Sequence, residues 1–120
     1  MELENLIELL KNNLPIPISY GWFDENIKGT HLTFFVLSEK PYFFDDDDFD
    51  YIKQTFQFDI WSQSENPYKY YPQLRELLKS NGFSYITMQG FNEKENNIFH
   101  LALRFEVTKQ DVLINEVNKW

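Results

Sequence analysis

The sequence predicts an α+β fold in which two helices pack on one face of an antiparallel sheet of about four strands, in the order α-β-β-α-β-β. Apolar residues recur every three or four positions in two segments, near residues 2–14 and 67–81. Other segments alternate apolar and polar residues, as strands with one buried face do. Two helices on the same side of the sheet would cover those apolar faces.

The N-terminal part predicts one helix and one or two strands. The helix, near residues 2–14, has an apolar stripe formed by Leu3, Leu6, Ile7, Leu10 and Leu14. Pro15 and Pro17 then keep residues 16–20 out of the helical region, as an edge strand or an extended arm. The β-branched and aromatic residues 31–37 predict a strand.

The middle of the chain combines an acidic loop with the clearest strand signal. Residues 41–50 read PYFFDDDDFD, and their like charges predict a mobile loop. Asp45 to Asp48 lack the alternating ligands and central glycine of a calcium-binding loop, so we expect no metal there. The segment 51–62 alternates, with Phe56, Phe58 and Ile60 on one face and Gln57, Asp59 and Trp61 on the other.

The second helix is predicted near residues 67–81, and Pro72 either kinks it or delays its start beyond Pro67. Residues 83–91 and 98–107 predict a hairpin. In its second strand, Leu101, Leu103 and Phe105 share one face and His100, Ala102 and Arg104 the other. We therefore expect one domain over residues 1–107, followed by a C-terminal tail or short helix over residues 108–120.

Composition excludes several classes of function. The chain has 120 residues, a net charge of −8 and no cysteine, which fits one acidic domain in a reducing compartment without disulfides or thiolate metal sites. Its apolar runs are too short to span a membrane, and the acidic N-terminus is unlike a signal peptide. A pI near 4.6 argues against specific binding of nucleic acid.

The polar residues indicate no enzyme. His31 and His100 both lie in predicted strands, and a His100–Asp59 pair across the sheet is geometrically possible, but no catalytic motif surrounds it. The chain has no nucleophile elbow and no glycine-rich phosphate loop. We therefore expect no catalytic residue, no cofactor and no metal site.

Aromatic residues are more numerous than the core can bury. Phe, Tyr and Trp account for 22 of the 120 residues, so some are expected at the surface, where exposed aromatic patches mark protein interfaces. The candidates flank turns, adjoin the acidic loop or lie on the polar face of a strand, and they are Tyr20, Trp22, Phe23, Tyr42, Phe43, Phe44 and Trp61.

Five runs in order resemble one known family. They are PISYGWFD (17–24), HLTFF (31–35), FQFDIWS (56–62), LL before GF (77–83) and FHLALRF (99–105). Together they resemble the tail-completion or tail-terminator proteins of long-tailed phages and Gram-positive prophages. The resemblance covers roughly residues 1–107 and rests on the order of these patterns along the chain.

The resemblance implies a fold and a role. Members of the family are α+β proteins that form a ring, commonly a hexamer, which caps the tail tube and prepares the tail for joining to the head. The implied partners are other copies of the chain, the tail tube protein and a head-completion protein, with no membrane and no specific nucleic-acid binding. The implied place is the virion tail, assembled in the cytoplasm of the bacterial host.

Two alternatives stay open at this point. The Asp45 to Asp50 cluster suits a small acidic prophage-encoded inhibitor that engages a basic host partner. The polar sheet face instead suits a small-molecule-binding domain, which would need a pocket on that face.

Overall fold

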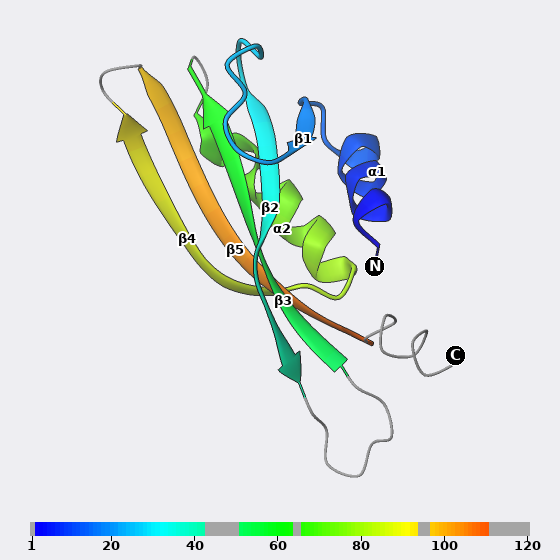
Figure 1. Cartoon of the computed structure of the whole chain (residues 1–120). Coiled ribbons are helices and arrows are strands. Elements are labelled where there is room, and N and C mark those ends of the chain that lie inside the picture. Colours follow the sequence, from blue (N-terminus) through cyan, green and yellow to red (C-terminus); the bar gives the residue numbers. More distant parts are fainter. Residues whose placement is uncertain (1, 43–50, 64–65, 94–96, 111–120) are drawn as a thin grey trace.

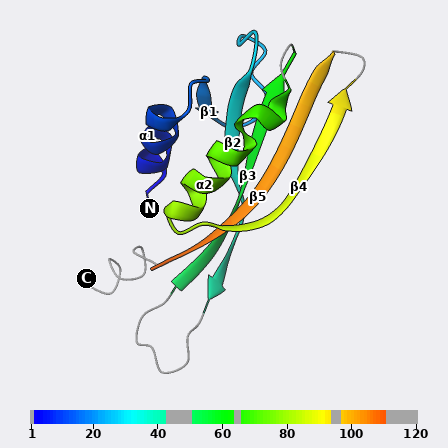
Figure 2. The ribbon, with the colours of Figure 1, turned by 180° about the vertical axis from the view of Figure 1, so that it is seen from behind.

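The computed structural model describes residues 2–42, 51–63, 66–93 and 97–110, which form a five-stranded sheet with two α-helices on one side (Figure 1). The elements are α1 (Leu3–Asn13), β1 (Ile18–Tyr20), β2 (His31–Tyr42), β3 (Tyr51–Ser62), the 3₁₀ turn η1 (Pro67–Tyr70), α2 (Tyr71–Ser80), β4 (Ser84–Glu93) and β5 (Ile98–Gln110). The strand order is β1-β2-β3-β5-β4. The view from behind shows α2 lying across the sheet and α1 beside β1 (Figure 2).

The predicted α+β class is confirmed, but the sheet differs from the prediction in two ways. It has five strands instead of about four, and it is mixed, because β1 pairs parallel with β2 while the other neighbours are antiparallel. A parallel neighbour requires a connection that crosses from one end of the sheet to the other. Residues 21–30 make that crossing without regular structure, and an irregular segment has no periodicity to reveal it.

The predicted facing of β3 and β5 is confirmed. Antiparallel pairing sets Phe58 opposite Leu103 and Ile60 opposite Leu101, and all four side chains are fully buried. On the helix side they are covered by side chains with at most 1% exposure, namely Leu6, Leu10, Leu74 and Leu78. Packing of matched apolar faces is the main stabilising contribution in a domain of this size.

The start of the second helix follows the later of the two alternatives. Asn66 caps η1, its side-chain oxygen accepting from the Tyr68 backbone N–H at 3.0 Å, and α2 begins only at Tyr71. Pro72 therefore lies in the first turn of α2, where its missing N–H costs no helical hydrogen bond. The helix ends before Gly82, whose φ of 88° is easily adopted without a Cβ.

Three strands extend beyond their predicted ends. β2 continues to Tyr42 and β4 to Glu93, and β5 reaches Gln110, so residues 108–110 belong to the sheet instead of the predicted tail. Residues 111–120 and the acidic run Asp45 to Asp48 lie outside the described residues. Within the described ranges, neither α-helix is long and apolar enough to cross a membrane.

Candidate functional site

The sheet face away from the helices, here called the open face, carries three rows of side chains. Antiparallel register sets facing residues side by side across neighbouring strands. The first row, called the ring row, consists of His31, Trp61, His100 and Phe91 from β2, β3, β5 and β4. The next two rows are Thr33, Asp59, Ala102 and Gln89, and then Phe35, Gln57, Arg104 and Thr87.

The ring row is a stack that crosses four strands. Trp61 and His100 lie nearly parallel, with ring centroids 3.7 Å apart and an interplanar angle of 13°. His31 continues the stack on one side at 6.5 Å from Trp61, and Phe91 on the other at 5.4 Å from His100. The Trp61 indole N–H donates to the Thr33 hydroxyl at 2.9 Å, so the polar group of this buried ring is satisfied.

The crossing segment between β1 and β2 covers part of the open face. Trp22 meets the rings of Trp61 and His100 edge-on, at centroid distances of 5.0 and 5.6 Å. Phe23 packs against His31 at 5.4 Å and against Trp61 at 5.1 Å. These contacts help to bury His31, Trp61 and His100 without a helix, whereas Phe91 at the end of the row stays 43% exposed.

Beneath this cover lies a buried carboxylate. Asp59 is 0% exposed, and its Oδ1 accepts hydrogen bonds from His100 Nε2 at 2.5 Å and from Gln57 Nε2 at 3.0 Å. The Gln57 carbonyl in turn accepts from Arg104 Nε at 3.3 Å. A buried charge is tolerated only when it is paired and hydrogen-bonded, so His100 and Gln57 are what allow Asp59 to lie here.

Two buried polar atoms of this face have no hydrogen-bond partner within the described part of the chain. They are Oδ2 of Asp59 and Nε2 of His31. The other ring nitrogen of His31 lies 3.2 Å from the Gly29 carbonyl, to which its N–H donates. Most buried polar groups in proteins have a hydrogen-bond partner, and burying one without a partner is unfavourable. On this face that unfavourable contribution comes from Asp59 and His31.

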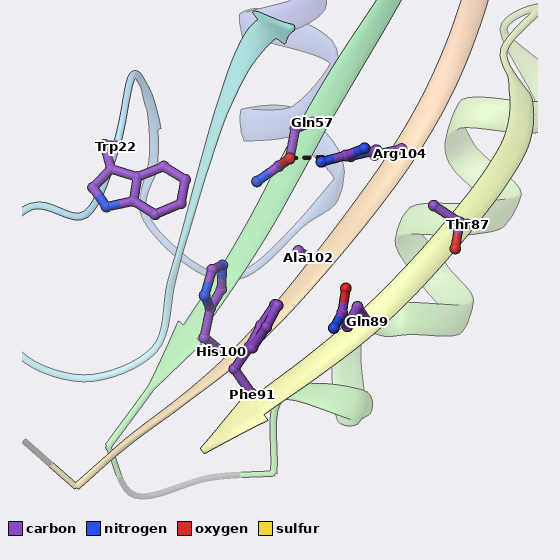
Figure 3. Close-up of a pocket in the computed structure, with 8 residues that line it drawn as sticks. All are labelled: Trp22, Gln57, Thr87, Gln89, Phe91, His100, Ala102 and Arg104. Carbon is purple, nitrogen blue, oxygen red and sulfur yellow. Dashed lines mark hydrogen bonds between the residues drawn. The ribbon is translucent and has the colours of Figure 1, made fainter. Parts of the chain in front are cut away.

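A cavity of about 340 Å³ opens beside this network (Figure 3). Its lining combines aromatic, amide and cationic side chains, namely Trp22, Gln57, Thr87, Gln89, Phe91, His100, Ala102 and Arg104. Three neighbouring strands contribute to it, and the small side chain of Ala102 lies between the longer ones of its own strand, His100 and Arg104. The volume is near the lower end of the range for ligand pockets.

A second cavity, of about 600 Å³, lies at the same end of β4 and β5 but next to η1. It shares Phe91 and His100 with the first cavity, and its other lining residues include Pro67, Tyr68 and Phe99. Gly90 also lines it, and a Cβ at this position would lie 3.0 Å from the Tyr68 hydroxyl. A side chain at position 90 would therefore press on the Tyr68 hydroxyl, which is the end of a side chain that is 47% exposed.

The seven aromatic residues predicted at interfaces have different surroundings. Tyr20 and Trp22 are 49% and 55% exposed, and Phe23 is partly buried. Trp61 is only 2% exposed, so the expected exposure is wrong for this residue, because the ring row and the cover formed by residues 21–30 enclose it. The side chain of Tyr42, together with Phe43 and Phe44, lies outside the described residues.

The His100–Asp59 contact, which the sequence shows only to be geometrically possible, is formed. The cavity beside it was not predicted, since its residues come from four separated segments that only the register brings together. Among the described residues, no group of three or more His, Asp or Glu side chains gathers in a way that could hold a metal ion.

Comparison with known proteins adds no family assignment. No protein-family model matches the chain. No curated protein matches it either.

Proposed function

We propose that this protein is a non-enzymatic structural subunit that assembles as a ring, with six copies as the expected number, on the end of a phage tail tube. The tail part of the proposal rests on the ordered patterns that resemble tail-terminator proteins. The observation that supports assembly is that the two edges of the sheet are unlike, and that each exposes apolar side chains.

The first edge is formed by β1 and the free part of β2. β1 pairs only with Leu32, Thr33 and Phe34, so the rest of β2 has no strand neighbour on that side within the described residues. A β-bulge between Val36 and Ser38 leaves Leu37 outside the ladder, and this side chain is 40% exposed. Tyr20, 49% exposed, adds an aromatic ring to the same edge.

The second edge is formed by β4. A bulge between Tyr85 and Thr87 leaves Ile86 outside the ladder, and this residue is 44% exposed. Phe91 and Phe99, each 43% exposed, lie farther along the β4–β5 hairpin. Each edge therefore carries more than one exposed apolar side chain, and exposed apolar surface is typical of contacts with other proteins.

Two unlike edges suit a closed ring. In a heterologous assembly each copy uses one surface to contact the preceding copy and a different surface to contact the next. Bulges interrupt the ladder at both edges, so we expect neighbours to meet through the side chains around Leu37 and Ile86 instead of through a continuous sheet. The net charge of −8 also suits a channel through which DNA slides without binding.

The decisive experiment deletes the gene from the phage or prophage that carries it. We expect filled heads beside tails that are overlong or that fail to join, as seen by negative-stain electron microscopy. Normal infectious particles would overturn the proposal, and they would favour the acidic inhibitor as the alternative.

Complementation of the deletion with variant genes tests whether the two sheet edges form the contacts between neighbouring copies. Leu37→Lys and Ile86→Lys each place a charge on one edge, and we expect neither variant to restore infectious particles. Gln73→Lys is the control, because it adds the same charge at an exposed position of α2, which lies across the sheet instead of along either edge. If both edge variants restore particles as well as the control does, the proposed mode of assembly is overturned.

A further inference from the structure

The cavity of about 340 Å³ on the open face, here called the open-face cavity, has a charge opposite to that of the protein as a whole. Arg104 is the one permanently charged side chain among the lining residues in the described part of the chain, whereas the protein carries a net charge of −8. The nearest carboxylate in the network, Asp59, is fully buried and already accepts two hydrogen bonds. An anion in the cavity would therefore meet a guanidinium without facing an exposed carboxylate from the lining.

One hydrogen bond orients the guanidinium of Arg104, whose side chain is otherwise exposed. Asp59 fixes the Gln57 amide by accepting from its NH₂ group, and the Gln57 carbonyl then accepts from Arg104 Nε. The terminal nitrogens of Arg104 make no hydrogen bond to the described residues that would occupy them. Such a fork binds a carboxylate through two parallel N–H···O bonds. Holding it in advance lowers the entropy lost on binding.

The remaining walls are suited to a flat apolar group. Trp22 and Phe91 present exposed rings, 55% and 43% exposed, at different sides of the cavity. Ala102 leaves space between them because its side chain is a single methyl group. The Thr87 hydroxyl and the Gln89 amide lie along β4 and offer hydrogen bonds at the rim. Aromatic walls with a few placed polar groups are typical of small-molecule sites.

We propose that the open-face cavity binds a small aromatic carboxylate, with the carboxylate on Arg104 and the ring over Ala102 next to Trp22. This site goes beyond the proposed tail function and does not depend on it. A purely inorganic anion would use Arg104 but leave the aromatic walls without contact, and a neutral aromatic would leave the guanidinium unpaired. The combination of both features selects the class of ligand.

The test uses benzoate as the probe and benzamide as its neutral counterpart. In ¹H–¹⁵N spectra of the full chain, we expect benzoate to shift the Trp22 indole and Arg104 Nε signals saturably, with a Kd of about 1 mM, as for a fragment-sized ligand. Benzamide and inorganic phosphate should each bind at least about tenfold more weakly, because each lacks one of the two contacts. Equal binding of benzoate and benzamide, or no saturable shift, would overturn the proposal.

Variants separate this site from general attraction of anions. Arg104→Gln removes the guanidinium, and Lys40→Gln is the matched control because it makes the same change of charge at an exposed position of β2 that does not line the cavity. We expect Arg104→Gln to weaken benzoate binding at least about tenfold and Lys40→Gln to change it less than about twofold. Equal effects of the two variants would overturn the proposal.

A third variant tests whether the ligand occupies the space over Ala102. Ala102→Leu fills the floor of the cavity while leaving Arg104 in place, and we expect it to abolish the saturable shift of the Trp22 signal. The remaining backbone signals of each variant show whether it is folded. If Ala102→Leu is folded and binds benzoate as the natural chain does, the ligand lies elsewhere and the proposed site is wrong.

Discussion

The two faces of the sheet are both buried near its centre, but by different means. On the helix side, α1 and α2 cover a face made of Leu, Ile and Phe side chains. On the open face, the irregular segment 21–30 covers three stacked rings, His31, Trp61 and His100, and the fully buried carboxylate of Asp59 lies beside them. Full burial of a residue in this protein therefore does not by itself identify a hydrophobic core, because Asp59 and Leu103 are both 0% exposed.

The two kinds of burial differ in how they respond to change. Apolar packing is not directional, and its contribution follows the area removed from water. A buried polar network instead depends on each member, because removing one partner leaves another group desolvated and unpaired. On the helix side, any introduced charge should therefore destabilise the protein. On the open face, the loss of a single hydrogen-bond partner should do so.

The largest effect is expected from a charge on the helix side. Leu103→Asp places an unpaired carboxylate among Phe58, Leu74 and other buried residues, which costs several kcal/mol against a total stability of about 5–15 kcal/mol. We expect this variant to be unfolded at 25 °C by circular dichroism. Gln89→Asp is the control, since Gln89 is exposed on the open face, and it should keep the natural melting temperature within a few degrees. A folded Leu103→Asp protein with unchanged melting would contradict the assigned facing.

A smaller effect is expected from breaking the polar network. His100→Phe retains a ring to stack on Trp61 but removes the donor to Asp59, and an uncompensated buried charge costs about 3–5 kcal/mol. Adding Asp59→Asn removes the charge, so the double variant should regain most of this loss. Urea unfolding at pH 7 of the natural chain, the two single variants and the double variant measures the free energy of unfolding of each. If the two losses simply add, the Asp59–His100 contact does not contribute to stability.

The helix-covered face could be predicted well from the sequence, and the open face could not. Alternation in residues 56–60 and 101–105 shows which side chains point the same way, and apolar matching then decides which face meets the helices. The same alternation places Asp59, Trp61 and His100 on the other face. It does not show that they touch, because contact depends on strand order and on which residues face each other.

The position of the cover was even less predictable. Trp22 and Phe23 lie in a segment without periodicity, and their place follows from the parallel pairing of β1 with β2, which no local pattern encodes. The sequence predicts Trp61 at the surface because its strand neighbours on that face, Gln57 and Asp59, are polar. The ring row buries it, since His31 and His100 are brought beside it by register alone.

The smallest effect is expected at the rim of the helix-covered face, where Tyr85 of β4 meets α2. Arg75 lies over the Tyr85 ring at 4.6 Å, and it also donates from Nη1 to the Tyr71 hydroxyl at 2.9 Å. Burial, followed by the hydrogen bond and charge interaction with Tyr71, raises the pKa of Tyr85 above its ordinary value of 10.0, and Arg75 lowers it in part.

The raised pKa of Tyr85 predicts a loss of stability in alkali. The folded protein keeps the hydroxyl proton to a higher pH than the unfolded chain does, so the contribution is full below the ordinary value of 10.0 and is lost as the pH rises beyond it. Tyr85→Phe has no proton to lose, so its urea midpoint should fall less steeply than that of the natural chain above this pH. The two proteins should show parallel midpoints near neutral pH, where the hydroxyl is protonated in both states. Equal slopes in alkali would mean that Tyr85 is as free in the folded protein as in the unfolded chain, and that the rim where α2 meets β4 holds no polar contact comparable to the one around Asp59.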